Sequence, residues 1–474
     1  MNRRKFVRSL SAIATCCVIS GAARFVSAAT PTALEDKDRI VVMISIDGLA
    51  NFYINDPSAE IPTLRKLADE GAKAASMRAS DPTVTWPNHT TLVTGVSPGV
   101  HGVVGNNYYD RVKGEKVTLI WDPTLEKDQV VKVPTIYDLA KAAGLKTAGI
   151  RWPMTRGAHA LDWNSPDLGE DSLILKYTTP ELLEECKEAG YKLTQKEDGT
   201  GKIGALTLQQ SIDDDKKWTN IFNMVLHKHH PNLALFHIVA VDHTEHVDGP
   251  RSPEAYEAIK AADELVQQII DELEKDYPGK ATVFIVSDHG FSANKIAVLP
   301  NVVLKEAGLV EAKGKKATGG VVELVPQGGS AFLYILDEAN RDEIIKKVKA
   351  AFANVEGVSS VIAADEFADY GIANPKRDPH EPDMMLFAKM GYFFGDTAAG
   401  SIPVDTKPER KGSHGHDSHF PDLHAMFIAW GDGIKPGVHL SEIDNRSVAP
   451  TIAKLLGIEI PNAEGKPLTE ILAQ

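Results

Sequence analysis

Three apolar, β-branched segments of this sequence each end in an aspartate, and they constrain the fold more than any other feature. The segments are RIVVMISIDG (39–48), NLALFHIVAVD (232–242) and ATVFIVSDHG (281–290). Short apolar runs of this kind are typical of buried strands. A long amphipathic helix is predicted at 252–277, between the second and third segments. This alternation of strand and helix predicts an α/β fold with a mainly parallel sheet covered on both faces.

The stretch 292–411 has a different composition. It holds a Gly/Lys-rich loop, EAKGKKATGG, followed by a predicted strand, a helix and another strand. We interpret this stretch as a smaller α+β insertion that caps or flanks a site. The main catalytic domain would then be built from residues 29–291 and 412–474.

The first 28 residues are typical of an export signal. A basic start that contains Arg3 and Arg4 precedes a mainly small and apolar run, and VSA stands just before Ala29. The apolar run is shorter than the ~20 residues that a membrane helix needs. The Arg pair resembles a twin-arginine signal, with an ordinary secretory signal as the alternative. We therefore expect a periplasmic or secreted protein with no stable membrane span in the mature chain.

The charge of the chain limits its partners. The net charge is −14 over 474 residues, and the first 28 residues carry basic charges but no acid. A mature chain this acidic lacks the basic footprint that duplex nucleic-acid binding needs. An anionic substrate would need a locally positive site, which bound metal ions can supply. Cys186 is the one cysteine beyond the predicted signal, so no disulfide can form within the mature chain.

Asp47, Asp242 and Asp288 lie at the ends of the three predicted strands. In an open α/β sheet, ligands bind outside the carboxyl ends of the strands, so the three carboxylates are expected at one edge. A single strand-terminal aspartate more often caps the following turn. Three of them, accompanied by histidines, indicate a functional site instead.

The histidines stand at spacings that suit metal binding. His246 lies four residues after Asp242, so both side chains can reach one ion if that turn is helical. His289 follows Asp288 directly and precedes a glycine, which permits the backbone to bend. His414 lies between small residues in KGSHGHDSH. Oxygen and imidazole ligands suit zinc best, with manganese or iron as alternatives, and two clusters indicate two metal ions.

The stretch DPTVTWPNHTTLVTG (81–95) contains five threonines. Pro87 suits the first position of a helix, because its missing N–H costs nothing there. Thr85 would then lie just ahead of the helix N-terminus, where free N–H groups and the dipole favour a phosphate and an alkoxide. Thr83 alternates to the other side of an extended segment, and the other three threonines fall within the helix. Position therefore favours Thr85 as a nucleophile, which a metal or a base would have to activate.

Several motifs occur together along the chain. PTVTWPNHTTLVTG is followed by HGVVGN, and SIDG, PTIYDLAKAAGLKTAGIRWP, DHTEHVDGP, SDHGF and GSHGHD extend the pattern over nearly the whole mature chain. In this combination the chain resembles the type I phosphodiesterase/nucleotide pyrophosphatase family of the alkaline phosphatase superfamily. The resemblance implies an alkaline-phosphatase-like α/β/α sandwich that binds two zinc ions.

The resemblance also implies roles for single residues. Thr85 would be the nucleophile and also touch one zinc, and Asn106 would donate to a nonbridging phosphate oxygen. Trp86 would pack against a nucleotide base or another leaving portion. Six further side chains would bind the metals: Asp47, Asp288 and His289 at the zinc of Thr85, and Asp242, His246 and His414 at the second zinc.

The implied activity is zinc-dependent hydrolysis of phosphodiester or pyrophosphate bonds through a covalent phosphothreonine, on a small substrate such as a nucleotide. Asn106 is neutral and contacts one oxygen, which leaves room for a second substituent on phosphorus and favours diesters. Phosphomonoesterase activity on the same site is an alternative. A protein of another class, a non-catalytic periplasmic metal- or phosphate-binding protein, would keep the ligands without the turnover.

Two features depart from the family pattern. The family tends to have a tyrosine five residues before the aspartate of the second site, and here that residue is His237. The stretch HGVVGNNYYD is close to phosphonoacetate hydrolases, which use the same zinc site and hold the substrate carboxylate with lysines. Lys113 and Lys116 follow this stretch and are candidates for that role, or else solvated loop lysines.

Overall fold

The computed structural model describes residues 38–194, 206–400, 403–407 and 410–473. The export signal predicted for residues 1–28 lies outside the described residues. Within them, no helix is both long enough and apolar enough to cross a membrane.

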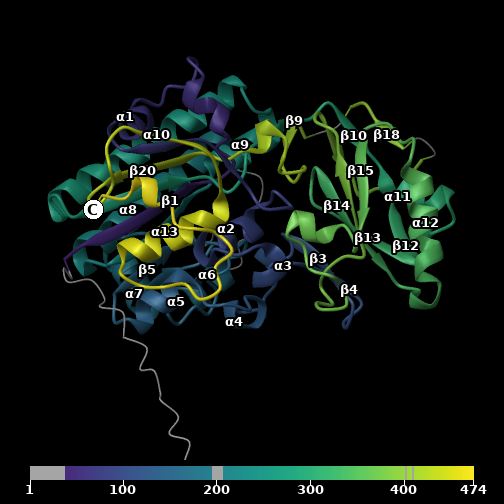
Figure 1. Ribbon diagram of the computed structural model, residues 1–474, viewed down its shortest axis with the longest axis horizontal. Helices are drawn as coiled ribbons and strands as arrows, with labels where there is room; N and C mark the ends of the chain where they lie inside the picture. Colours follow the sequence, from purple (N-terminus) through teal and green to yellow (C-terminus); the bar gives the residue numbers. More distant parts are fainter. Residues whose placement is uncertain (1–37, 195–205, 401–402, 408–409, 474) are drawn as a thin grey trace, which may run out of the picture. The chain divides into compact units, whose positions relative to one another are not determined.

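Eight strands form the central sheet. They are β1 (Ile40–Ile46), β2 (Ala72–Arg78), β5 (Thr147–Ile150), β6 (Trp163–Ser165), β7 (Leu233–Ile238), β8 (Ala281–Val286), β20 (Phe427–Gly431) and β21 (Val438–Asp444). Their order is β21-β2-β20-β8-β1-β7-β5-β6; β20, β1 and β5 are labelled in Figure 1. β1 pairs in parallel with β7 and β8, while β20 runs antiparallel to β2 and β8. The predicted mainly parallel sheet is therefore confirmed.

Helices cover both faces of this sheet. Successive side chains of β1 point to opposite faces, and both sets are buried. Ile40, Val42 and Ile44 join one buried cluster, and Val41 and Met43 join another on the opposite face. The first cluster takes in side chains of α1 (Pro62–Glu70), α8 (Leu208–His229) and α10 (Pro253–Asp276). The second takes in α2 (Thr85–Thr94), α5 (Ile136–Ala142) and α13 (Val448–Leu455). Both faces of β1 are buried, which explains its unbroken apolar sequence.

Shorter elements connect these layers. They are α3 (Pro98–His101), β3 (Asn107–Asp110), β4 (Glu115–Thr118), α4 (Lys127–Val130), α6 (Asp171–Tyr177), α7 (Pro180–Glu188) and α9 (Ala240–Asp248). β3 and β4 form an antiparallel hairpin directly after Asn106.

A second, antiparallel sheet lies within the stretch 292–411. It has the order β13-β14-β16-β15, with β13 (Val322–Pro326), β14 (Ser330–Ile335), β15 (Val358–Ala363) and β16 (Met384–Ala388) (Figure 1). Leu333 of β14 packs into a cluster with α11 (Pro300–Glu306) and α12 (Arg341–Phe352), whereas Phe332 and Tyr334 join the main core cluster. The inner face of this sheet therefore packs on the catalytic core. The bounds of the insertion as a domain stay a prediction.

Short strands complete the stretch. They are β9 (Ser292–Ala293), β10 (Ile296–Val298), β11 (Val310–Lys313), β12 (Lys316–Gly320), β17 (Tyr392–Phe394), β18 (Val404–Asp405) and β19 (Gly412–Ser413). β19 pairs with β9, so both ends of the stretch 292–411 meet next to the site described below.

Candidate active site

Three neighbouring strands of the central sheet bring the predicted aspartates together. β8, β1 and β7 lie side by side and run parallel. Asp47 directly follows β1, Asp288 follows shortly after β8, and Asp242 lies in the first turn of α9 after β7. Since the carboxyl ends of parallel strands meet at one edge, the three carboxylates gather there.

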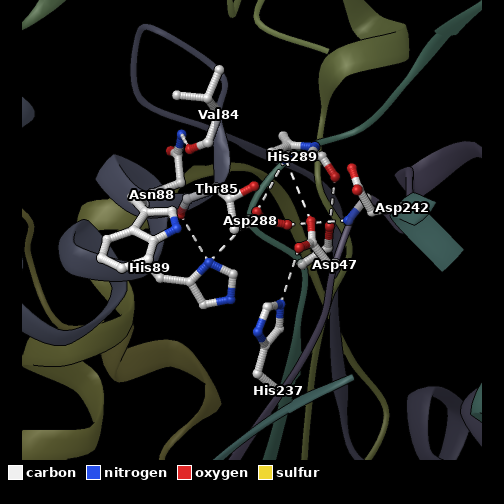
Figure 2. Close-up of polar contacts among 12 residues, drawn as sticks. Asp47, Val84, Thr85, Asn88, His89, His237, Asp242, Asp288 and His289 are labelled. Carbon is white, nitrogen blue, oxygen red and sulfur yellow. Dashed lines mark hydrogen bonds and ion pairs between the residues drawn. The ribbon is translucent and has the colours of Figure 1, made fainter. Parts of the chain in front are cut away.

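The first cluster consists of Asp47, Asp288 and His289, all buried (Figure 2). One potential ligand atom from each lies within 4.8 Å of the others. His289 Nε2 is 3.1 Å from Asp288 Oδ2 and 3.5 Å from Asp47 Oδ1. None of these three atoms has a hydrogen-bond partner among the described residues. Buried polar atoms without partners are costly, and a bound cation would satisfy all three at once.

The second cluster surrounds Asp242. Its Oδ1 lies 3.4 Å from His414 Nε2 and 3.5 Å from His246 Nε2, and it too lacks a hydrogen-bond partner in the described part of the chain. Asp242, His289 and His414 also have ligand atoms within 4.8 Å of one another. The rings of His289 and His414 stack with centroids 3.8 Å apart. His289 thus lies where the two clusters meet.

Backbone carbonyls orient all three histidines. Nδ1 of His246 lies 3.1 Å from the oxygen of Gly412, and Nδ1 of His289 lies 3.1 Å from the oxygen of Gly290. Nδ1 of His414 lies 3.0 Å from the carbonyl oxygen of Thr83, two residues before the start of α2. An Nδ1–H that donates to a carbonyl leaves Nε2 as the free lone pair, which is how metal-binding histidines are held.

The protonation of the site also suits a metal. Burial lowers the pKa of His246 and of His414 to about 3, so both rings are neutral near pH 7. Burial, together with repulsion from a neighbouring carboxylate, raises the pKa of Asp47 and of Asp288 well above the usual range. A group of carboxylates that resist ionising together favours a divalent cation between them. The donor set of carboxylate oxygens and imidazole nitrogens therefore fits zinc.

Thr85 is the first residue of α2, and Val84 before it is extended. The expectation that the helix begins at Pro87 was wrong: Pro87 is its third residue. A proline is tolerated there because the first four N–H groups of a helix have no partner within it. The three other threonines lie in the helix body, as predicted, with Thr90 and Thr94 bonded to the carbonyls four residues before them.

Asn106 and Trp86 lie beside the start of α2. The backbone N–H of Trp86 donates to Asn106 Oδ1 at 2.9 Å. This bond orients the amide of Asn106 through its oxygen, and the NH₂ group on the same amide is a donor. Trp86 is only 3% exposed, so it can offer a substrate only a small part of its surface.

A cavity of ≈ 510 Å³ opens over these residues, and Thr85, Asn106, Asp242 and His414 are part of its lining. The stretch 292–411 supplies a further part of the wall: Pro326, Gln327, Gly328, Phe393, Phe394 and Asp396. Trp121 stands in the wall as well and is 38% exposed. It offers a far larger aromatic surface than Trp86, and no sequence motif pointed to it.

Residues 41–417 match the sequence profile described as type I phosphodiesterase / nucleotide pyrophosphatase. The chain belongs to this family. The match spans most of the chain and covers every residue of both clusters. The family consists of phosphodiesterase and pyrophosphatase hydrolases, so the family and the enzyme class inferred from the motifs are confirmed.

Two curated relatives show the extent of the likeness. An uncharacterized pyrophosphatase/phosphodiesterase of Schizosaccharomyces pombe is 24% identical over 426 residues, which cover 88% of this chain and 77% of the relative. Ectonucleotide pyrophosphatase/phosphodiesterase family member 1 of Mus musculus is 24% identical over 436 residues, which cover 89% of this chain and 41% of the relative. The chain thus spans less than half the length of the mouse protein.

Two solved structures share the fold. Human ectonucleotide pyrophosphatase/phosphodiesterase 5 matches with a TM-score of 0.67 and 18% identity over 92% of this chain and 100% of that chain. An inactive threonine-to-alanine variant of the murine protein, in complex with AMP, matches with a TM-score of 0.67 and 17% identity over the same shares. The likeness shows the alkaline-phosphatase-like α/β fold that the sequence predicts.

His237, which departs from the tyrosine typical of the family, contacts the first cluster directly. Its ring is fully buried, Nε2 lies 3.1 Å from Asp47 Oδ2, and Nδ1 lies 3.1 Å from the carbonyl oxygen of Arg151 (Figure 2). Strand pairing explains the contact, because His237 on β7 is opposite Ser45 on β1, two residues before Asp47. His237 therefore holds one oxygen of Asp47 and leaves the other turned toward His289.

Phenylalanine in place of His237 is expected to lower zinc affinity about tenfold or more, since partners that orient a metal ligand typically contribute that much. The ring volume is kept, but the hydrogen bond to Asp47 Oδ2 is lost. Titration against a chromophoric zinc chelator measures the effect. His439→Phe is the matched control, because His439 is exposed on β21. Equal zinc affinities of the two variants would contradict this role.

The two lysines considered for a phosphonate substrate lie outside the cavity lining. Lys113 Nζ is 3.5 Å from Asp110 Oδ2, and Lys116 Nζ is 2.9 Å from Glu323 Oε1. Both lysine side chains are exposed by more than a third, and Lys116, which lies on β4, is also 3.6 Å from Asp396 Oδ1, so both ammonium groups already face carboxylates. Their placement does not favour the phosphonoacetate hydrolase alternative.

Proposed function

We propose that this chain hydrolyses phosphodiester or pyrophosphate bonds with two zinc ions, through a covalent intermediate on Thr85. One observation carries the proposal. Buried ligand atoms of Asp47, Asp242, Asp288 and His289 lack hydrogen-bond partners in the described residues, and two of these four residues, Asp47 and Asp242, line the same cavity as Thr85. Such a set needs cations, and a hydroxyl beside cations can become a nucleophile.

The metal ligands are proposed to divide as the family resemblance implies. Asp47, Asp288 and His289 would hold one zinc together with Thr85, and Asp242, His246 and His414 would hold the other. When bound, the zinc ions supply the Lewis acidity that stabilises the threonine alkoxide and the departing oxygen.

The chain's own residues perform the remaining steps. Thr85 Oγ1 attacks phosphorus in line, a P–O bond to threonine forms, and the bond to the leaving oxygen breaks. The positive end of the helix dipole at the start of α2 favours the negative charge that gathers there. The NH₂ group of Asn106 donates to a nonbridging oxygen, since its Oδ1 is held by Trp86. Water then attacks the phosphothreonine, which releases a phosphomonoester and restores the hydroxyl.

The cavity favours a diester or a pyrophosphate substrate. Asn106 is a neutral donor, so phosphorus can carry a second substituent, for which Trp121 and Phe394 provide an apolar wall. Arg410 is an exposed cation in the same lining and can accept a further phosphate. AMP is bound in the murine relative, which supports a nucleotide as the substrate here.

Four substrates test this proposal: bis-p-nitrophenyl phosphate, p-nitrophenyl phosphate, a dinucleotide and phosphonoacetate. We expect the two diesters to be hydrolysed with the highest kcat/KM, and a chelator to abolish all turnover. A clear preference for the monoester would overturn the diesterase assignment. Zinc binding without turnover of any of the four would support a non-catalytic metal-binding protein instead.

We also propose that residues 1–28 export the protein, which places it in the periplasm or outside the cell. The basic start and apolar run of these residues support this location. The twin-arginine pair supports export of a protein that is already folded and loaded with metal.

A further inference from the structure

Thr83 lies two residues before the proposed nucleophile and is fully buried. Its carbonyl oxygen is 3.0 Å from His414 Nδ1 and accepts the N–H of Gly415 at 2.8 Å. Its hydroxyl donates to the carbonyl oxygen of His416 at 2.7 Å and accepts from the N–H of Gly415 at 3.0 Å. Thr83 therefore bonds to three consecutive residues of the loop that carries a proposed zinc ligand.

The extended backbone between Thr83 and Thr85 explains why these two side chains act on different partners. Val84 has φ −129° and ψ 159°, so the residues on either side of it point in opposite directions. Thr85 lines the cavity, whereas Thr83 faces the loop 414–416. The sequence predicted that Thr83 turns away from the cavity, and the structure shows what it turns toward.

A second pair of bonds joins the same two segments. Asp81 is buried, and its carboxylate accepts the N–H of Ser418 at 2.9 Å and the hydroxyl of Ser418 at 2.7 Å. The segment 81–83 thus runs along the loop 414–418 and bonds to it at both ends. The register of this pairing sets where His414 stands relative to Thr85.

The side of the loop 414–416 that faces away from Thr83 packs tightly against residues 327–329. The N–H of Gly329 donates to the carbonyl oxygen of His414 at 2.7 Å. A Cβ added at Gly415 would come within 1.9 Å of the carbonyl oxygen of Gln327, and one added at Gly328 within 2.4 Å of that of His414. The loop is therefore held between the segment 81–83 and the turn between β13 and β14.

We infer that Thr83 is a positioning residue that fixes the second metal site relative to the nucleophile. The inference rests on the proposed function, in which His414 binds the second zinc and Thr85 attacks. Its carbonyl sets the tautomer and direction of the His414 ring, and its hydroxyl fixes the backbone on which that ring stands. In-line attack requires the nucleophile and the second ion at a set separation, and errors near 1 Å reduce the rate strongly.

Thr83→Val tests this role, because it keeps the shape and the carbonyl of Thr83 but removes the hydroxyl. We expect the second zinc to bind about 10–100-fold more weakly while the first is retained. At limiting free zinc the protein should therefore hold nearer one zinc per chain than two. The kcat on bis-p-nitrophenyl phosphate should fall more than KM changes, and excess zinc should restore part of it.

Thr94→Val is the matched control. Thr94 is as buried as Thr83, but its hydroxyl bonds to Thr90 within α2 and not to the loop 414–416. This variant should keep both zinc ions and most of the activity, and Thr83→Ser should also stay near wild type. Thr83→Ala, compared with Thr94→Ala, gives a second measurement if the first variant is poorly folded.

The outcomes separate this inference from the proposed function. Two bound zinc ions and full activity in Thr83→Val, with Thr94→Val the same, would overturn the inference and leave the proposed function standing. Weak zinc binding in both valine variants would mean that any lost hydroxyl disturbs the site, which also overturns it. A wild-type protein that binds no zinc would overturn the proposed function and this inference with it.

Discussion

Alanine in place of Thr85 is expected to abolish phosphodiester turnover while the protein still binds zinc. Removing the attacking group of a covalent mechanism typically lowers kcat by about 10⁴-fold or more. The hydroxyls of Thr90 and Thr94 in the same helix are bonded to helix carbonyls and lie outside the cavity lining. The proposed side chains at the first zinc other than Thr85 are unchanged, so zinc content should stay near two per chain. Elemental analysis and the rate on bis-p-nitrophenyl phosphate measure both quantities.

Thr85→Ser and Thr90→Ala are the controls for this experiment. Serine keeps a hydroxyl at the start of α2 and should retain part of the activity, whereas Thr90→Ala should behave nearly as wild type. Rapid acid quenching during turnover should leave a phosphoryl group on the peptide that contains Thr85, detectable by mass spectrometry. Near-wild-type activity of Thr85→Ala would show that another group, or water, attacks phosphorus.

The parts of the fold that the sequence predicts are those set by short-range patterns. β1, β7 and β8 are uniformly buried and were readable as apolar runs, and their terminal aspartates followed from the same pattern. The direction of β20 was not readable, since a strand has the same periodicity whether it pairs parallel or antiparallel. The start of α2 was placed two residues late, because a proline fits the third helical position as well as the first.

The parts of the site that could not be predicted from the sequence depend on contacts between segments that are far apart in the chain. His237 meets Asp47 only because β7 pairs with β1 in one register. Trp121 ends a short 3₁₀ helix (Leu119–Trp121) and Phe394 ends β17, yet both line one cavity, and no spacing along the chain connects them. Thr83 was recognised as turned away, but its partner lies 333 residues further on. Motifs therefore identified the proposed ligands, while the residues that hold the ligands needed the structure.

Removal of the metal ions is expected to inactivate the protein and to lower its unfolding temperature by on the order of 10 °C. A ligand present at about 1,000 times its Kd stabilises the folded state by about 4 kcal/mol per site. For a domain of 150–250 residues, each kcal/mol moves Tm by about 2–4 °C, and a larger chain lies at the low end. Calorimetry of the chelated and the zinc-reloaded protein measures the shift. Equal unfolding temperatures would contradict the presence of a metal centre.

Single aspartate-to-asparagine substitutions show how much each cluster contributes to this shift in unfolding temperature. Asp242→Asn weakens only the second cluster, so one zinc should remain on Asp47, Asp288 and His289, with about half of the stabilisation. Asp288→Asn should remove the first zinc, because it removes one of that zinc's carboxylates. It should also weaken the second zinc, because His289 lies close to both clusters and loses its contact with the Asp288 carboxylate. The two variants should therefore differ in zinc content although each loses one negative charge. Equal zinc contents would show that the clusters bind one shared ion, since a single ion between Asp47, Asp242 and Asp288 would depend on each carboxylate alike.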